Sequence, residues 1–166
     1  MKVKLDIPYP EVSVEKENLY YADLLSQDYA GIVSETTASL LYSYQHFNTF
    51  KDNKEFSDII EEISITEMTH LELLGKTIKL LGKEPIYKSC NAITEECVMW
   101  NASNVNYDDN IKDMLRTNIK GEKAAIKNYL EHKRLIKDKY VKELLSRIIL
   151  DEKRHIEIFE MLLEKM

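Results

Sequence analysis

The stretch Glu152-Lys-Arg-His155 and an earlier copy, Glu67-Met-Thr-His70, each hold a carboxylate and an imidazole three residues apart. On an α-helix, side chains with this spacing lie on the same side. Around both copies, large apolar residues recur in steps of three and four, as they do along the inward-facing side of a bundle helix. The pattern predicts two long helices, each with one Glu and one His set into its apolar face.

These inward-facing carboxylates need a compensating positive charge. An unpaired carboxylate is very costly among apolar side chains, and neither apolar face contains a Lys or an Arg. A bound metal ion is the natural source of the missing charge. The alternative is a buried network of polar side chains that holds no metal.

Four helices are expected, over residues 18–50, 55–81, 108–137 and 139–166. Asn18 is a residue type favoured at the position that caps a helix N-terminus, so the first helix should begin there. Gly82, with Pro85 shortly after it, should end the second helix.

The links between these helices predict their topology. The first and third links are short, which makes antiparallel helix pairs, whereas residues 83–107 are numerous enough to travel the length of a bundle. This is an all-α, ferritin-like four-helix bundle with one long crossover between its second and third helices. We expect a single domain over residues 1–166, with residues 1–17 as an extended N-terminal arm.

An internal repeat relates the two halves of the chain. The first helix contains Glu35-x-x-Ala-x-x-x-Tyr42 and the third contains Glu122-x-x-Ala-x-x-x-Tyr129. Within each predicted helix pair, the two glutamates lie at nearly equal distances from the connecting link. In an antiparallel pair, equal distance from the link means equal height along the bundle. Four Glu and two His should therefore meet at one level, related by a pseudo-twofold axis.

The charge of this cluster suits two metal ions. Four carboxylates carry a charge of minus four, and two divalent cations would neutralise them. Mixed carboxylate and imidazole ligands suit iron or manganese better than calcium or magnesium, while ligand type alone leaves zinc open. The candidate metal ligands are Glu35, Glu67, His70, Glu122, Glu152 and His155.

Three further residues are expected to lie beside the ligands. Asp151 precedes Glu152 and should accept a hydrogen bond from a ligand histidine, His70 across the bundle, without binding metal. Tyr42 and Tyr129 each follow a candidate ligand by seven residues, on the same helix face. Each is either a core tyrosine whose hydroxyl finds a partner, or a residue that supports the metal ligands or their redox chemistry.

Other candidate groups are expected to have no part in the site. His46 and His132 lie near the predicted bundle ends and should be residues of the surface or of the ends of the apolar faces. Cys90 and Cys97 lack the paired CxxC spacing of a zinc or rubredoxin-type site, and two free thiols are expected in a cytosolic protein. A redox pair is the alternative for the cysteines.

Composition bounds the functional class. The 166 residues are 44% hydrophobic with only four Gly and three Pro, which favours a mostly helical protein with a full core. The net charge of −6 and the lack of a basic patch argue against nucleic acid and anionic membranes as partners. The N-terminus has no apolar run typical of a signal peptide, and no stretch is as long as a membrane span. We expect a soluble, cytoplasmic protein.

The motifs resemble those of the ferritin-like superfamily, closest to rubrerythrins and manganese catalases. Glu35-Thr-Thr-Ala-Ser-Leu-Leu-Tyr42-Ser-Tyr44 resembles the first-helix motif of rubrerythrins. Thr66-Glu67-Met-Thr-His70-Leu-Glu72 resembles the second-helix motif of manganese catalases, and Pro8-Tyr-Pro10 is similar to their N-terminal arm. The later motifs, Gly121-Glu122 and Asp151-Glu152-x-x-His155, fit either branch.

The resemblance implies the ligand set given above and hydrogen peroxide as the substrate of a dimetal oxidoreductase, of catalase or peroxidase type. The chain departs from rubrerythrins in lacking a rubredoxin domain and in having Ala125 where they carry an extra Glu; it is also shorter than most manganese catalases. A peroxidase would require an external electron donor, whereas a catalase would not. Glu35 and Glu122 are the expected catalytic carboxylates, and we expect a homo-oligomer. The alternative function is that of a non-enzymatic iron-binding or structural protein.

Overall fold

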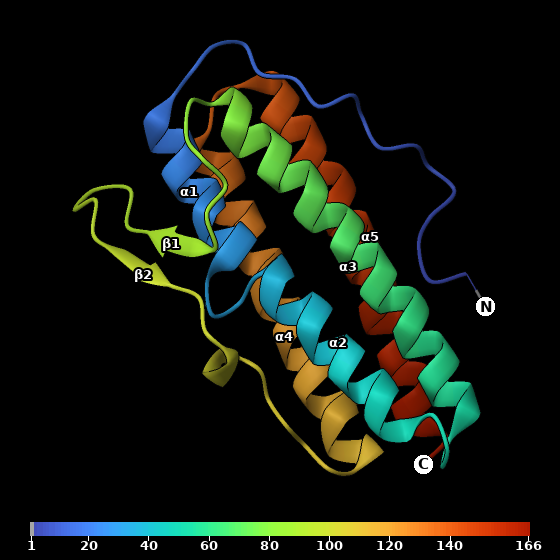
Figure 1. Ribbon diagram of the computed structural model, residues 1–166. Coiled ribbons are helices and arrows are strands. Elements are labelled where there is room, and N and C mark those ends of the chain that lie inside the picture. Colours follow the sequence, from blue (N-terminus) through green and yellow to red (C-terminus); the bar gives the residue numbers. More distant parts are fainter. Residues whose placement is uncertain (1) are drawn as a thin grey trace.

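The computed structural model describes residues 2–166, and its centre is a bundle of long helices packed side by side (Figure 1). The helices are α1 (Leu19–Ala30), α2 (Glu35–Thr49), α3 (Lys54–Leu80), α4 (Ile111–Leu135) and α5 (Lys139–Glu164). The α2–α3 and α4–α5 pairs are antiparallel hairpins with short links, and a long segment connects α3 to α4. The predicted all-α, ferritin-like bundle with one crossover is confirmed.

The expected first helix, 18–50, is wrong in one respect, because it is broken between α1 and α2. Ser34 caps α2 by accepting a hydrogen bond from the Thr37 backbone N–H, and its hydroxyl donates to the Gly31 carbonyl. A side chain at Gly31 would place its Cβ 2.5 Å from the Gln27 carbonyl oxygen, so only glycine fits the break. Glu35 therefore lies in the first turn of α2, where the helix dipole favours a negative charge.

The remaining helix ends follow from capping side chains. The predicted cap Asn18 accepts a hydrogen bond from the Tyr21 backbone N–H at 3.1 Å. Asn53, Asn110 and Asp138 accept equivalent bonds at the starts of α3, α4 and α5. Gly82 follows α3 with a φ of 99°, a conformation that favours glycine, and the helix ends there as predicted.

The crossover between α3 and α4 is more ordered than expected. It contains a two-stranded antiparallel hairpin, β1 (Lys88–Cys90) and β2 (Cys97–Met99), followed by a 3₁₀ turn at Ala102–Asn104. The prediction of two free thiols is wrong, because Cys90 and Cys97 form a disulfide. The strand register places the two cysteines directly opposite each other, so their sulfur atoms meet.

The N-terminal arm runs alongside α5 (Figure 1). Its backbone near Glu15 is bonded to Asp138, its middle near Ile7 to Arg147, and its start near Lys2 to Arg154. The described part of the arm contains no helix or strand.

Two apolar clusters fill the bundle and leave a polar layer between them. One cluster contains Leu74 and Ile78 of α3 with Leu145 and Ile148 of α5. The other contains Ile60 and Ile63 of α3 with Phe159 and Leu162 of α5. The residues between these positions, on the same helices, include both Glu-x-x-His pairs. Among residues 2–166, no helix is long and apolar enough to cross a membrane.

Candidate metal centre

All six predicted ligands meet in the polar layer at the middle of the bundle. Each side chain is at most 3% exposed, and the six come from four helices: Glu35 (α2), Glu67 and His70 (α3), Glu122 (α4), Glu152 and His155 (α5). They form two overlapping groups of four residues. Within each group, one ligand atom from every residue lies within 4.8 Å of the others. Glu67 and Glu152 belong to both groups, so these two carboxylates lie where they could bridge a pair of ions.

The two groups are nearly symmetric. His70 Nδ1 lies 3.0 Å from Glu67 Oε2 and 3.1 Å from Glu152 Oε1, with Glu35 Oε2 at 3.6 Å. His155 Nδ1 lies 2.9 Å from Glu67 Oε1 and 3.1 Å from Glu152 Oε2. Glu122 completes this second set, with Oε1 at 3.6 Å from the same nitrogen. Both imidazoles present Nδ1 to the carboxylates, and the two sets have the pseudo-twofold relation that the sequence repeat predicts.

The residues present fit a pair of metal ions. Glu67 Oε1 and Glu152 Oε1 are fully buried, and although a histidine Nδ1 lies close to each, neither oxygen accepts a well-aligned hydrogen bond, which is costly for a carboxylate. Both oxygens belong to the shared carboxylates, where a cation would satisfy them. Four carboxylates and two imidazoles also provide hard oxygen and borderline nitrogen donors, a set that suits first-row divalent metals.

The pKa values of the cluster residues show which of them bind protons when no metal is bound. Burial raises the pKa of Glu35 and Glu122 well above the usual range, and the charges of Glu152 and Glu67 raise it further. Burial would lower the pKa of His70 and His155, but the surrounding carboxylates raise it well above the usual value. The metal-free cluster therefore holds extra protons, which metal ions must displace.

Glu67 behaves in the opposite way. Burial would raise its pKa, but the charges of His155 and His70, together with the hydrogen bond to His70, hold it well below the usual range. This shared carboxylate stays ionised in the metal-free protein and is ready to receive a cation.

The repeated tyrosines support the carboxylates of the opposite half. Tyr42 on α2 donates a hydrogen bond to Glu122 Oε1 on α4, and Tyr129 on α4 donates to Glu35 Oε1 on α2. Burial is the largest cause that raises the pKa of both tyrosines, so each hydroxyl keeps its proton and acts as a donor. Both hydroxyls have partners, and these partners are candidate metal ligands.

Asp151 lies behind His70. Its Oδ2 is 3.3 Å from His70 Nε2, the ring nitrogen that faces away from the carboxylates, and it also accepts from the Tyr9 hydroxyl at 2.6 Å. The other oxygen accepts from the Leu5 backbone N–H at 3.0 Å, and Arg147 Nη1 lies 2.8 Å from Oδ2. Burial would raise the pKa of Asp151, but hydrogen bonds from His70, Arg147 and Tyr9 hold it well below the usual range.

Sequence reasoning missed the contributions of Tyr9 and Arg147. Arg147 precedes Asp151 by four residues on one helix face, a spacing that could have indicated the pair. No local signal indicates that Tyr9 folds back onto α5. His155 has no equivalent support, since its Nε2 is buried without a partner.

The two other histidines lie outside the cluster. His46 Nδ1 lies 2.9 Å from the Ser57 hydroxyl oxygen. His132 is buried at the last turn of α4, where its Nδ1 lies 2.6 Å from Asp28 Oδ2 of α1. Of the two expected places, the surface or the end of an apolar face, His132 therefore has the second, and its ring lies against the buried Asp28 carboxylate.

A cavity of about 230 Å³ leads to the cluster between α2 and α4. Its buried lining includes Glu35, Glu122 and both tyrosines. Its solvent-exposed lining residues include Ile32, Lys120 and Asn106. Most of its surface is apolar, from residues such as Leu41 and Ala125. The cavity is large enough for a small molecule to reach the carboxylates of Glu35 and Glu122.

Comparisons with known proteins agree with the fold and with a family of dimetal proteins. The model of the family described as Rubrerythrin matches residues 29–163. A probable manganese catalase from Clostridium acetobutylicum is 27% identical over 94% of this chain and 76% of its own length. A manganese catalase from Anabaena superposes with a TM-score of 0.81 at 28% identity, over 99% of this chain and 80% of that one. A bacterioferritin from Desulfovibrio desulfuricans, at 23% identity and a TM-score of 0.73 over 87% of this chain and 78% of that one, shares the fold.

Proposed function

The chain belongs to the rubrerythrin family, and on this premise we propose that it is a dimetal oxidoreductase that disproportionates hydrogen peroxide. Two molecules of peroxide would give two of water and one of dioxygen. The observation that carries the proposal is the buried cluster of four Glu and two His at the base of an accessible cavity. Whole-chain similarity to two manganese catalases supports peroxide as the substrate.

Each proposed ligand has a place in this scheme. Glu67 and Glu152 would be shared by two ions of iron or manganese. Glu35 with His70 would complete one coordination set, and Glu122 with His155 the other. The metal pair would supply the two-electron exchange that peroxide chemistry needs.

The protein's own groups would hold the protons of the reaction. Glu35 and Glu122 line the cavity through which peroxide would enter, so their carboxylates are the nearest groups able to take up or return a proton. Tyr129 bonds to Glu35 Oε1, so the other oxygen, Oε2, is the one that lies toward His70. Tyr42 bonds to Glu122 Oε1, the same oxygen that lies toward His155, so this tyrosine would hold the oxygen nearest the proposed metal. The apolar cavity walls restrict bulk water around these groups.

Disproportionation is favoured over reduction by an external donor because of what lies beside the site. Ala125 lines the cavity where a rubrerythrin would present a further carboxylate, and its methyl group offers neither a ligand nor a proton. Peroxide can serve as both oxidant and reductant, so a catalase cycle needs no store of electrons.

The test is oxygen release by metal-loaded protein, measured with an oxygen electrode. We expect dioxygen from peroxide without added reductant, and loss of this activity in Glu122→Gln. Glu72→Gln, an exposed residue of α3, is the matched control and should retain activity. Peroxide consumption only in the presence of a reductant would indicate a peroxidase instead. A fully metallated protein that consumes no peroxide would refute the proposal and favour the non-enzymatic alternative.

A further inference from the structure

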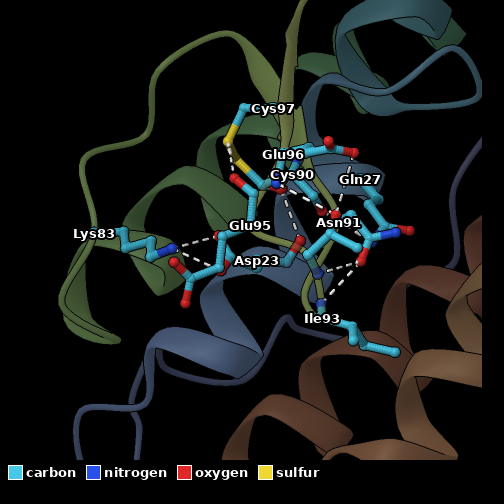
Figure 2. The surroundings of a disulfide bond; sticks show 11 residues. Asp23, Gln27, Lys83, Cys90, Asn91, Ile93, Glu95, Glu96 and Cys97 are labelled. Atoms are coloured by element: carbon cyan, nitrogen blue, oxygen red, sulfur yellow. Dashed lines mark hydrogen bonds and ion pairs between the residues drawn. A yellow bond between two sulfur atoms is a disulfide. The ribbon is translucent and has the colours of Figure 1, made fainter.

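The disulfide in the crossover joins β1 to β2 (Figure 2), and its two cysteines are unequally exposed. Cys90 is 4% exposed and packs against α1, whereas Cys97 and the other residues of β2 are exposed. The exposed residues around the bond are mixed: Ile93 is 85% exposed and Val98 68%, and the acidic Glu95 and Glu96 beside Cys97 are exposed as well. A reagent in solution can therefore approach the Cys97 side of the bond but not the Cys90 side.

Strand β1 is fastened to α1 independently of the disulfide. The Ser26 hydroxyl accepts a hydrogen bond from the Cys90 backbone N–H at 2.8 Å, and the Gln27 side chain donates to the Cys90 carbonyl at 3.1 Å. Strand β2 pairs with β1 alone in a sheet of two three-residue strands. Isolated hairpins of this size are marginal at best in water. The disulfide therefore adds a covalent tie to the backbone bonds that hold β2, one of which runs from the Trp100 N–H to the Tyr87 carbonyl at 2.9 Å.

The chain after β2 leads directly to the cavity above the metal centre. Trp100 Nε1 donates a hydrogen bond at 2.9 Å to Oγ1 of Thr37, which is two residues after Glu35 on α2. Asn104 and Asn106, a few residues further on, line the cavity. Residues 97–106 therefore form a strap, fastened at one end by the disulfide, that covers part of the approach to the site.

We propose that Cys90–Cys97 is a thiol–disulfide exchange site for an external dithiol, and that its reduction loosens the strap over the cavity. A thiolate of the reductant attacks Cys97 Sγ, the S–S bond breaks, and Cys90 leaves as a thiolate that takes up a proton. The second thiol of the reductant then attacks the mixed disulfide and releases Cys97. Two electrons and two protons pass from the dithiol to the protein, and the reductant becomes a disulfide.

This inference does not depend on peroxide activity. It requires only that the bond can be reduced in the folded protein and that the strap responds. The two cysteines would then make access to the metal centre depend on the redox state of the surroundings.

The test compares metal-loaded protein before and after treatment with dithiothreitol, which is removed before measurement. Thiol counting should find two new thiols per chain with unchanged helical circular dichroism. Hydrogen–deuterium exchange of residues 97–106 should then rise several-fold while exchange in α5 stays unchanged. A chelator should also extract the metal several-fold faster from the reduced protein.

Two variants locate the effect. Cys90→Ser/Cys97→Ser should behave like reduced protein with or without dithiothreitol. Trp100→Phe keeps the disulfide but loses the hydrogen bond to Thr37, so its oxidised form should exchange faster over residues 97–106. Resistance of the disulfide to reduction short of unfolding, or equal exchange over residues 97–106 in both redox states, would overturn the proposal.

Discussion

The Tyr42 hydroxyl on α2 donates a hydrogen bond to Glu122 on α4, across 80 positions of sequence. The same contact occurs in reverse between Tyr129 and Glu35. The carboxylate on α2 is therefore oriented by a tyrosine of α4, and the carboxylate on α4 by a tyrosine of α2. The two halves cannot separate without releasing both carboxylates, so the metal centre and the packing of the bundle depend on each other.

Removing one of these hydroxyls should weaken metal binding without unfolding the protein. Tyr42→Phe leaves Glu122 Oε1 without its donor, and loss of such a supporting contact typically costs about 10- to 100-fold in metal affinity or activity. Metal titration should find the same stoichiometry with lower affinity. Tyr44→Phe is the matched control, since its hydroxyl bonds only to the Asp108 carbonyl at 3.4 Å. Unchanged affinity in Tyr42→Phe would show that the contact does not orient a ligand.

The shared carboxylates should matter for both metal ions. We expect two ions per chain by elemental analysis of reconstituted protein, because four Glu and two His balance two divalent charges. Glu67→Ala or Glu152→Ala should lower occupancy at both positions, whereas Glu122→Ala should affect one position more than the other. A stoichiometry of one or zero in the unmutated protein, or full occupancy in both Glu67→Ala and Glu152→Ala, would contradict the ligand assignment.

Asp151 should tune metal binding without contacting metal. Asp151→Asn removes the charge that faces His70 and Arg147, so both metals should still bind, with affinity lower by about 10- to 100-fold. Tyr9→Phe removes only one donor to Asp151 and should have a smaller effect in the same direction. Isothermal titration with the metal would measure both. Complete loss of one metal ion in Asp151→Asn would mean that Asp151 is itself a ligand.

Metal removal should lower stability most at neutral pH. The raised pKa values of Glu35, Glu122, His70 and His155 mean that the metal-free folded state binds more protons than the unfolded state. Its stability should therefore fall as the pH rises above the unfolded carboxyl pKa of about 4.3 and on through the histidine value of about 6.5. Glu67 opposes this trend, because its lowered pKa adds stability above the unfolded value that is lost in acid.

Thermal melts of metal-free and metal-loaded protein at several pH values would check the sign. The gap in melting temperature should be large at pH 7, since metal binds the native state. It should shrink in mild acid, where protons compete for the ligands and the metal-free cluster is neutralised. Equal melting temperatures at pH 7 would be inconsistent with a buried metal site.

Much of the fold and the cluster could be predicted because helix geometry is local. The spacing of Glu152 and His155 within apolar residues is enough to place both on one inward face, whatever the rest of the chain does. Link lengths then fix which helices are antiparallel neighbours, and equal distances from the links bring Glu35 level with Glu67. The six residues of the cluster follow from these one-dimensional patterns.

Only the tertiary structure decided the contacts between segments that share no local pattern. The bond between Tyr9 and Asp151 depends on the path of an arm without secondary structure, and the burial of His132 depends on where α1 places Asp28. The Cys90–Cys97 disulfide requires a register that seven residues of sequence separation do not specify. Periodicity reports which face of a helix is buried, but the partner across a gap is set by distances in three dimensions, which arise only when the whole chain has packed.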